Sequence, residues 1–213
     1  MSRALRVLVV DDQQLLRRGL RMLLETTDSI EVVAEAADGA EALAQLNKLD
    51  TVEVVLTDAR MPGMDGIELV TACAEQHTGL PVVVLTTFDD EDVVLGLLGA
   101  GAAGFLLKDV STETLAEALE SVAGGGMVID PRVTRIALRR QRPAPTDDAL
   151  ALLTRAARLV AEQVAKGATN TEIADTLVLA EGTVKNHVSA LLRKLQSRDR
   201  TALALILHRV FGE

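Results

Sequence analysis

The sequence predicts an α/β protein: a doubly wound, five-stranded parallel sheet followed by a second, smaller domain that is entirely helical. Within the first 123 residues, short apolar runs alternate with longer segments in which apolar residues recur at helical spacing, which is the pattern of consecutive β-α units. Beyond about residue 150 every periodic segment is helical. Between the two regions, Pro143–Asp148 has the composition of a linker.

Each expected strand is a short aliphatic run, as parallel strands covered by helices on both faces require. The expected strands are Arg6–Val10, Glu31–Ala36, Val52–Thr57, Pro81–Thr86 and Gly104–Leu107. The helices expected to follow them are Gln14–Thr26, Gly39–Asn47, Gly66–Glu75, Glu91–Gly99 and Thr112–Val122.

Three consecutive glycines, Gly124–Gly126, end this pattern. We therefore divide the chain into a first domain of residues 1–123, a linker of residues 124–149 and a helical domain of residues 150–213. The linker contains a short basic helix at Arg132–Arg142. The helices expected in the last domain are Thr154–Lys166, Thr171–Leu177, Glu181–Leu195 and Arg200–Val210.

The charge distribution supports two domains with different partners. Residues 1–130 carry 8 Lys and Arg against 23 Asp and Glu, a net charge of −15, whereas residues 131–213 carry 14 against 8, a net charge of +6. A basic domain attached to an acidic one favours nucleic acid as a partner of the basic domain.

Composition also indicates where the protein works. Apolar residues make up 48% of the 213 residues, with no Trp or Tyr, so we expect an aliphatic core. No apolar run has transmembrane length and the N-terminus shows no signal-peptide pattern, so we expect no membrane partner. The single cysteine, Cys73, excludes an internal disulfide and fits the cytoplasm.

Three acidic residues and one lysine follow the expected strands. Asp11 and Asp12 follow the first strand, Asp58 the third and Lys108 the fifth. Because the carboxyl ends of parallel strands meet at one edge of a sheet, we expect these side chains to lie together. Three neighbouring carboxylates repel one another unless a cation lies between them, and Mg²⁺ prefers oxygen ligands and phosphate.

This arrangement predicts a site that handles a phosphoryl group. Pro62 and the glycines around it force an irregular loop after Asp58, which leaves that carboxylate at a strand end as a phosphoryl acceptor. Lys108 supplies a positive charge for a phosphoryl oxygen. Thr86 supplies a hydroxyl at the end of the fourth strand, although periodicity alone does not decide between Thr86 and Thr87.

Four segments resemble the receiver domain of bacterial response regulators, which has a flavodoxin-like fold, over about residues 4–123. They are Val7–Asp12, Val54–Gly66, Leu85–Thr87 and Phe105–Asp109. The resemblance implies that a sensor histidine kinase phosphorylates Asp58. It also implies that Asp11, Asp12, Asp58 and the backbone carbonyl of Arg60 hold Mg²⁺, and that Thr86, Lys108 and Phe105 form the phosphoryl-contacting and switch residues.

A phosphatase of the haloacid-dehalogenase type is the alternative function for the acidic site. Such enzymes also use a strand-end aspartate and Mg²⁺, but their general acid is an aspartate two residues after the nucleophile. Position 60 of this chain is arginine, so we expect no independent enzyme activity.

The helical domain contains a predicted helix-turn-helix. Thr169 and Glu172 have the spacing of a capping box, and the helix they begin is followed after a short turn by an amphipathic helix from Glu181. The polar face of this second helix carries Lys185, Asn186 and Ser189, which are side chains that can hydrogen bond to base edges. We expect Arg193, Lys194, Arg198 and Arg200 to offset phosphate charge.

Residues Gly167–Ala174, Glu181–Val188, Leu192–Leu195 and Arg198–Thr201 resemble the LuxR-type helix-turn-helix over about residues 150–211. With a receiver, this is the architecture of NarL/FixJ response regulators, which implies a transcription factor that binds promoter DNA and forms a homodimer on activation. The DNA-binding residues it implies are Thr171, Thr183, Lys185, Asn186, His187, Ser189 and Lys194.

Two positions depart from that family's pattern. Ala157 replaces the glutamate of a Leu-Thr-x-Arg-Glu motif, and we expect it to remove a packing salt bridge. Ala180 replaces a serine that caps the second helix, a loss of about 1 kcal/mol of helix stability. These departures leave open a second hypothesis, in which the basic domain is degenerate and the output is binding to a protein partner.

Overall fold

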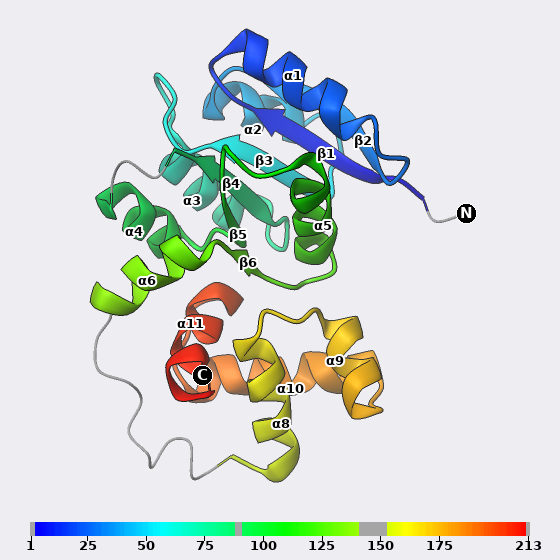
Figure 1. The fold of residues 1–213 in the computed structure, drawn as a ribbon, viewed down its shortest axis with the longest axis vertical. Helices are drawn as coiled ribbons and strands as arrows, with labels where there is room; N and C mark the ends of the chain where they lie inside the picture. Colours follow the sequence, from blue (N-terminus) through cyan, green and yellow to red (C-terminus); the bar gives the residue numbers. More distant parts are fainter. Residues whose placement is uncertain (1–2, 88–90, 141–152, 212–213) are drawn as a thin grey trace.

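The computed structural model describes residues 3–87, 91–140 and 153–211. The chain forms an α/β lobe that contains the N-terminus and a helical lobe that contains the C-terminus (Figure 1). The expected linker Pro143–Asp148 lies outside the described residues.

The first lobe is a parallel sheet with the strand order β2-β1-β3-β4-β5-β6. The order runs outward in both directions from β1, so the expected doubly wound fold is confirmed. The strands are β1 (Leu5–Val10), β2 (Ile30–Ala36), β3 (Val54–Asp58), β4 (Val82–Thr86), β5 (Gly104–Leu107) and β6 (Val128–Ile129). The helices between them are α1 (Gln14–Leu24), α2 (Gly39–Leu46), α3 (Gly66–Gln76), α4 (Glu91–Ala100) and α5 (Thr112–Ala123).

Helices cover both faces of the sheet, as the continuous apolar runs of its strands require. On one face, Leu24 of α1 and Leu119 of α5 pack against Val9 and Leu56. On the other face, helices α2, α3 and α4 pack against alternate residues of the same strands, among them Leu8. The aliphatic core expected from the composition is therefore divided into two layers.

The sheet has six strands, not the five expected. β6 is only two residues long and pairs in parallel with β5, with Ile129 opposite Phe105. The backbone N–H of Asp130 extends this pairing by donating to the Phe105 carbonyl oxygen at 2.9 Å. Two residues cannot display a period, so the hydrogen-bonding partner, rather than any local sequence pattern, makes this segment a strand.

The basic helix expected in the linker is α6 (Pro131–Arg140), and it packs on the first lobe. Val133, Ile136 and Ala137 are buried in the same core layer as α4. Residues 141–142 of the expected helix lie outside the described residues. Because β6 and α6 pack on the sheet and on α4, we propose that the first domain ends after α6 rather than at residue 123.

The second lobe contains α8 (Arg155–Ala165), α9 (Asn170–Leu177), α10 (Glu181–Lys194) and α11 (Arg200–Phe211) around a core of its own. Thr169 and Glu172 form the expected capping box at the start of α9. Ala180 precedes α10 without a side-chain cap, as expected. At the start of α8, the Thr154 hydroxyl accepts from the Ala157 backbone N–H at 3.2 Å.

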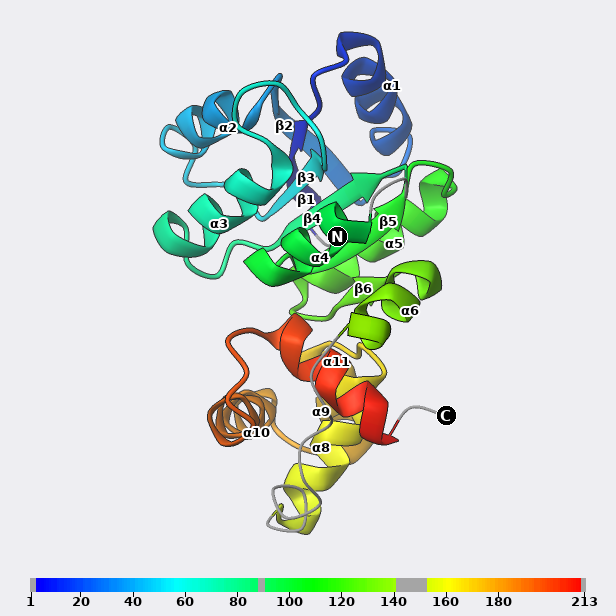
Figure 2. The ribbon, with the colours of Figure 1, turned by 90° about the vertical axis from the view of Figure 1, so that its left-hand side faces the viewer.

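The two lobes are in direct contact along α4, α6 and α11 (Figure 2). Leu205 of α11 is buried within the core layer of the first lobe. The Arg198 guanidinium donates to the Leu98 carbonyl oxygen at 2.6 Å, and the Thr201 hydroxyl donates to the Ala102 carbonyl oxygen at 2.8 Å. Helix α10 lies at the left-hand side of its lobe in Figure 2, and the lower end of α8 lies farther from the sheet.

Candidate functional site

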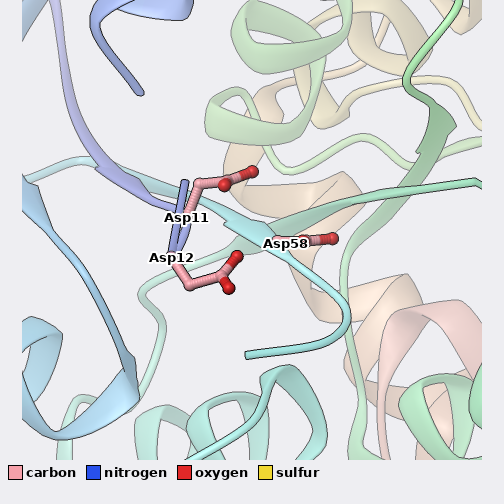
Figure 3. A group of neighbouring side chains, drawn as sticks. All are labelled: Asp11, Asp12 and Asp58. Atoms are coloured by element: carbon pink, nitrogen blue, oxygen red, sulfur yellow. The ribbon is translucent and has the colours of Figure 1, made fainter. Parts of the chain in front are cut away.

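The three predicted carboxylates meet at the carboxyl edge of the sheet (Figure 3). Asp11 follows β1, Asp12 is its neighbour, and Asp58 ends β3. One oxygen of each lies within 4.8 Å of the others. Asp11 and Asp58 are buried whereas Asp12 is exposed, so the cluster is open to solvent on one side only. Carboxylates this close, with an open side, can hold a hard cation.

Lys108 joins two of these carboxylates. Its ammonium lies 3.0 Å from Asp11 Oδ2 and 2.8 Å from Asp58 Oδ2. Burial alone would lower the pKa of Lys108, but the hydrogen bonds to Asp58 and Asp11 outweigh it and hold that pKa above its ordinary value. Lys108 is therefore a fixed positive charge beside both carboxylates.

The loop after β3 holds Asp58 in place. The Ala59 backbone N–H donates to Asp58 Oδ1 at 2.7 Å. The start of α3 packs tightly against this turn: a Cβ on Gly66 would lie 2.6 Å from the Asp58 carbonyl oxygen, so only glycine fits there. Asp65 and Glu68 complete a capping box that fixes the same end of α3. The irregular loop expected from Pro62 and its glycines is thus present.

The remaining predicted residues of the first lobe lie around this edge. Thr86 ends β4 and is only 8% exposed, whereas Thr87 is exposed beyond the strand, which favours Thr86 as the hydroxyl at the site. Phe105 is fully buried in β5, opposite Val84. Arg60 is exposed two residues beyond Asp58.

On the second lobe, α10 presents the predicted polar face to solvent. Val184, Val188 and Leu191 are buried in the lobe's core, which turns the opposite side of the helix outward. The predicted DNA-binding residues are all exposed except His187, which is half-buried: Thr171, Thr183, Lys185, Asn186, Ser189 and Lys194. Lys185 also pairs with Glu181 one turn earlier at 3.4 Å. Thr171 lines a crevice between the lobes together with Glu117 and Glu120 of α5.

Two of the four expected phosphate-neutralising residues have other partners. Arg198 contacts the first lobe through Leu98 and pairs with Asp199 at 2.9 Å. Arg200 is half-buried, its pKa lowered by that burial, and it donates to the Ala168 carbonyl oxygen and the Asn170 side chain at 2.6 and 3.0 Å. In this arrangement these two arginines join structural elements, so a role in offsetting phosphate charge stays a prediction for the separated helical domain.

The structure also revises the expectation about Ala157. This residue is the third of α8, and Thr154 is its N-cap. A glutamate there would occupy the position that Glu172 occupies in the complete capping box of α9. The alanine therefore removes half of a capping box.

Sequence reasoning missed Arg17, which contacts the acidic site from α1. Its guanidinium donates to the Asp11 backbone carbonyl at 2.5 Å. Its position on α1, five residues after Asp12, offered the only sequence signal, because a helical second turn can reach back to the preceding strand end.

The doubly wound sheet with a strand-end carboxylate cluster, joined to an exposed recognition-type helix, defines a receiver linked to a DNA-binding module. Comparison with known proteins agrees. The model of the response regulator receiver domain matches residues 7–120, and that of the luxR family of bacterial regulatory proteins matches residues 151–207. The chain therefore belongs to the NarL/FixJ family of response regulators, which are transcription regulators and not enzymes.

Individual relatives match along nearly the whole chain. The nitrate/nitrite response regulator NarP of Escherichia coli is 40% identical over 94% of this chain and 93% of its own length. The crystal structure of the response regulator ChrA, from a heme-sensing two-component system, is 34% identical, with a TM-score of 0.56 over 97% of this chain and 98% of that one. A structure of RcsB dimers bound to DNA is 26% identical, with a TM-score of 0.59 over 98% of this chain and 100% of the RcsB chain.

Within the described parts of the chain, none of the helices has the length and apolarity that crossing a membrane requires.

Proposed function

We propose that Asp58 is the phospho-acceptor of a two-component pathway and that its phosphorylation by a sensor histidine kinase controls promoter binding by the helical domain. The observation that carries this proposal is the convergence of Asp11, Asp12 and Asp58 within 4.8 Å, with Lys108 between two of them. The cytoplasm, where kinase and promoter are both accessible, is the location that this function requires.

The donor set fits Mg²⁺, with the three carboxylates and the Arg60 carbonyl as its ligands. When bound, Mg²⁺ offsets the repulsion between a carboxylate and an incoming phosphoryl group. An Asp58 oxygen attacks phosphorus as the bond from phosphorus to the kinase imidazole nitrogen breaks, and the imidazole leaves as a neutral base once it has taken a proton. Lys108, now 2.8 Å from Asp58, then pairs with a phosphoryl oxygen.

The conformational change that follows phosphorylation starts at Thr86. A phosphoryl group on Asp58 draws the Thr86 hydroxyl toward it, and Phe105 repacks into the space behind. Helix α4 follows β4 directly in the fold, and the helical domain is bonded to the end of α4 and the turn after it through Leu98 and Ala102. A shift of α4 therefore weakens this contact and favours release of the helical domain and homodimer formation.

The released domain would bind promoter DNA through α10. The exposed side chains of Lys185, Asn186 and Ser189 suit base edges, and those of Thr171, Thr183, His187 and Lys194 suit phosphates. The relative RcsB has been solved on DNA as dimers. Two such helices of a homodimer would meet half-sites about one DNA turn apart.

The test is phosphorylation of the full chain by a small phosphodonor with Mg²⁺, followed by intact mass measurement and promoter footprinting. We expect wild type to gain one phosphoryl group and a stronger footprint. Asp58→Asn should gain neither, while Asp28→Asn, at an exposed position remote from the site, should behave as wild type. Stoichiometric phosphorylation of Asp58→Asn would show that the acceptor is elsewhere.

A further inference from the structure

The turn that carries Asp11 and Asp12 has no helix cap to hold it. Helix α1 begins after Gln13, whose side chain makes no capping hydrogen bond, and the first turn contains no acidic residue. The Asp12 side chain is exposed, and no hydrogen bond to it is present among the described residues. Its direction therefore depends on the backbone of the β1–α1 turn.

Arg17 adds a restraint to this turn, beside the Gln13 backbone N–H that donates to Asp11 Oδ1 at 2.9 Å. The carbonyl to which it donates at 2.5 Å belongs to the peptide unit that joins Asp11 to Asp12. Fixing that peptide plane restrains the backbone from which both side chains leave, and so limits the directions that the two carboxylates can take. Only 14% of the Arg17 side chain is exposed, so the guanidinium cannot be replaced there by water without opening the turn.

An ion pair with Glu35 holds Arg17 itself. Its Nε lies 3.9 Å from Glu35 Oε2, too far for a hydrogen bond, and that nitrogen is buried without another partner. Glu35, on β2, is anchored in turn by Arg21 at 3.0 Å. The series Arg21, Glu35, Arg17 thus ties the first two turns of α1 and the end of β2 to the acidic pair.

We propose that Arg17 is a positioning residue for the cation site, and that Glu35 acts through it. The proposal rests on the function proposed above, because it assigns to Arg17 the alignment of Asp11 and Asp12 toward Asp58. Arg17 and Lys108 contact different parts of Asp11, because Arg17 donates to its backbone carbonyl and Lys108 pairs with its carboxylate.

The experiment compares Arg17→Met with Arg18→Met in the full chain. Both substitutions remove one guanidinium from α1 and keep an aliphatic side chain, but Arg18 is exposed and makes no contact with the site in the described structure. The Mg²⁺ dissociation constant is measured by calorimetry, and the rate of phosphorylation by a small phosphodonor is measured as a function of Mg²⁺ concentration.

We expect Arg17→Met to raise the Mg²⁺ dissociation constant by about tenfold, as is typical when a partner behind the metal ligands is lost. Saturating Mg²⁺ should restore most of its phosphorylation rate, which a general loss of folded protein would not allow. Arg18→Met should stay within about twofold of wild type. Glu35→Gln should weaken Mg²⁺ binding less than Arg17→Met does. In the double variant, Glu35→Gln should not raise the Mg²⁺ dissociation constant beyond that of Arg17→Met alone.

Unchanged Mg²⁺ affinity in Arg17→Met, with wild type binding Mg²⁺ and accepting phosphate normally, would overturn the positioning role alone. A wild-type chain that binds no Mg²⁺ would overturn this inference and the proposed function together. If Arg17→Met does not fold, Arg17→Gln, which keeps a polar end without the charge or the reach, decides the question by the same affinity measurement.

Discussion

The contact between the two lobes can be weakened at a single hydroxyl. Thr201 is 3% exposed and donates to the Ala102 carbonyl oxygen at 2.8 Å. Thr201→Val keeps the shape of the side chain but leaves that carbonyl buried without its partner. The cost in the docked state is about 1–3 kcal/mol, while in the undocked state water replaces the lost bond. The docking equilibrium should therefore shift toward separation by about 5- to 150-fold.

The shift can be measured in the unphosphorylated protein. Small-angle X-ray scattering should give a larger radius of gyration for Thr201→Val than for wild type. Because Thr171 lies in a crevice with Glu117 and Glu120 while the lobes are docked, phosphates approaching it meet carboxylates. Promoter affinity of unphosphorylated Thr201→Val should therefore rise toward that of the phosphorylated wild type. Salt should reduce this gain, since it screens the repulsion.

Thr176→Val is the matched control, because Thr176 is exposed on α9 and is not part of the contact between the lobes. It should change neither the radius of gyration nor the promoter affinity. If Thr201→Val scatters as wild type does and binds DNA no better, the hydrogen bond to Ala102 does not hold the lobes together and our account of the contact is wrong.

Three further predictions concern the two lobes separately. Ala157→Glu should complete the capping box of α8 and stabilise the helical lobe against thermal unfolding by about 0.5–1 kcal/mol. The control is Ala156→Glu, one position earlier, which cannot complete the capping box and should gain less stability. Val178→Gly should also stabilise the helical lobe, by about 1 kcal/mol, because Val178 is β-branched, has φ +53° and is 89% exposed. An unchanged midpoint of thermal unfolding would contradict backbone strain at Val178. Finally, the pKa of Lys108 is raised by folding, so the stability it contributes is complete below its unfolded pKa and is lost as pH rises through the higher folded value. In Lys108→Met the free energy of unfolding should therefore fall less as pH rises through this range than it does in wild type. If it falls equally in both proteins, the ion pairs of Lys108 do not contribute to stability.

The sequence was most informative where a period or a strand end defined a position. The proximity of Asp11, Asp58 and Lys108 follows from their places in the sequence alone, because parallel strands bring their carboxyl ends to one edge. β6 could not be foreseen, since a strand of two residues has no period and exists through its bonds to β5.

Arginines were the least predictable side chains. Arg198 and Arg200 were expected to face DNA phosphates, yet one bonds to α4 and the other is half-buried beside Ala168. Arg17 also touches the site, yet no motif in the sequence marks it. A long cationic side chain on an amphipathic helix has several carbonyl acceptors within reach, and only the packing of neighbouring elements decides among them.

The brevity of β6 has a consequence for the solubility of the separated form. While the lobes are docked, the backbone N–H of Met127, just before β6, donates to the Gly167 carbonyl oxygen of the helical lobe at 3.1 Å. Separation of the lobes leaves β6 as an uncovered edge strand of the sheet. An edge strand of two residues is too short to pair with a strand of another molecule. The opposite edge strand, β2, is longer, but it carries the charged residues Glu31 and Glu35. Neither edge of the sheet therefore favours aggregation when the two lobes separate.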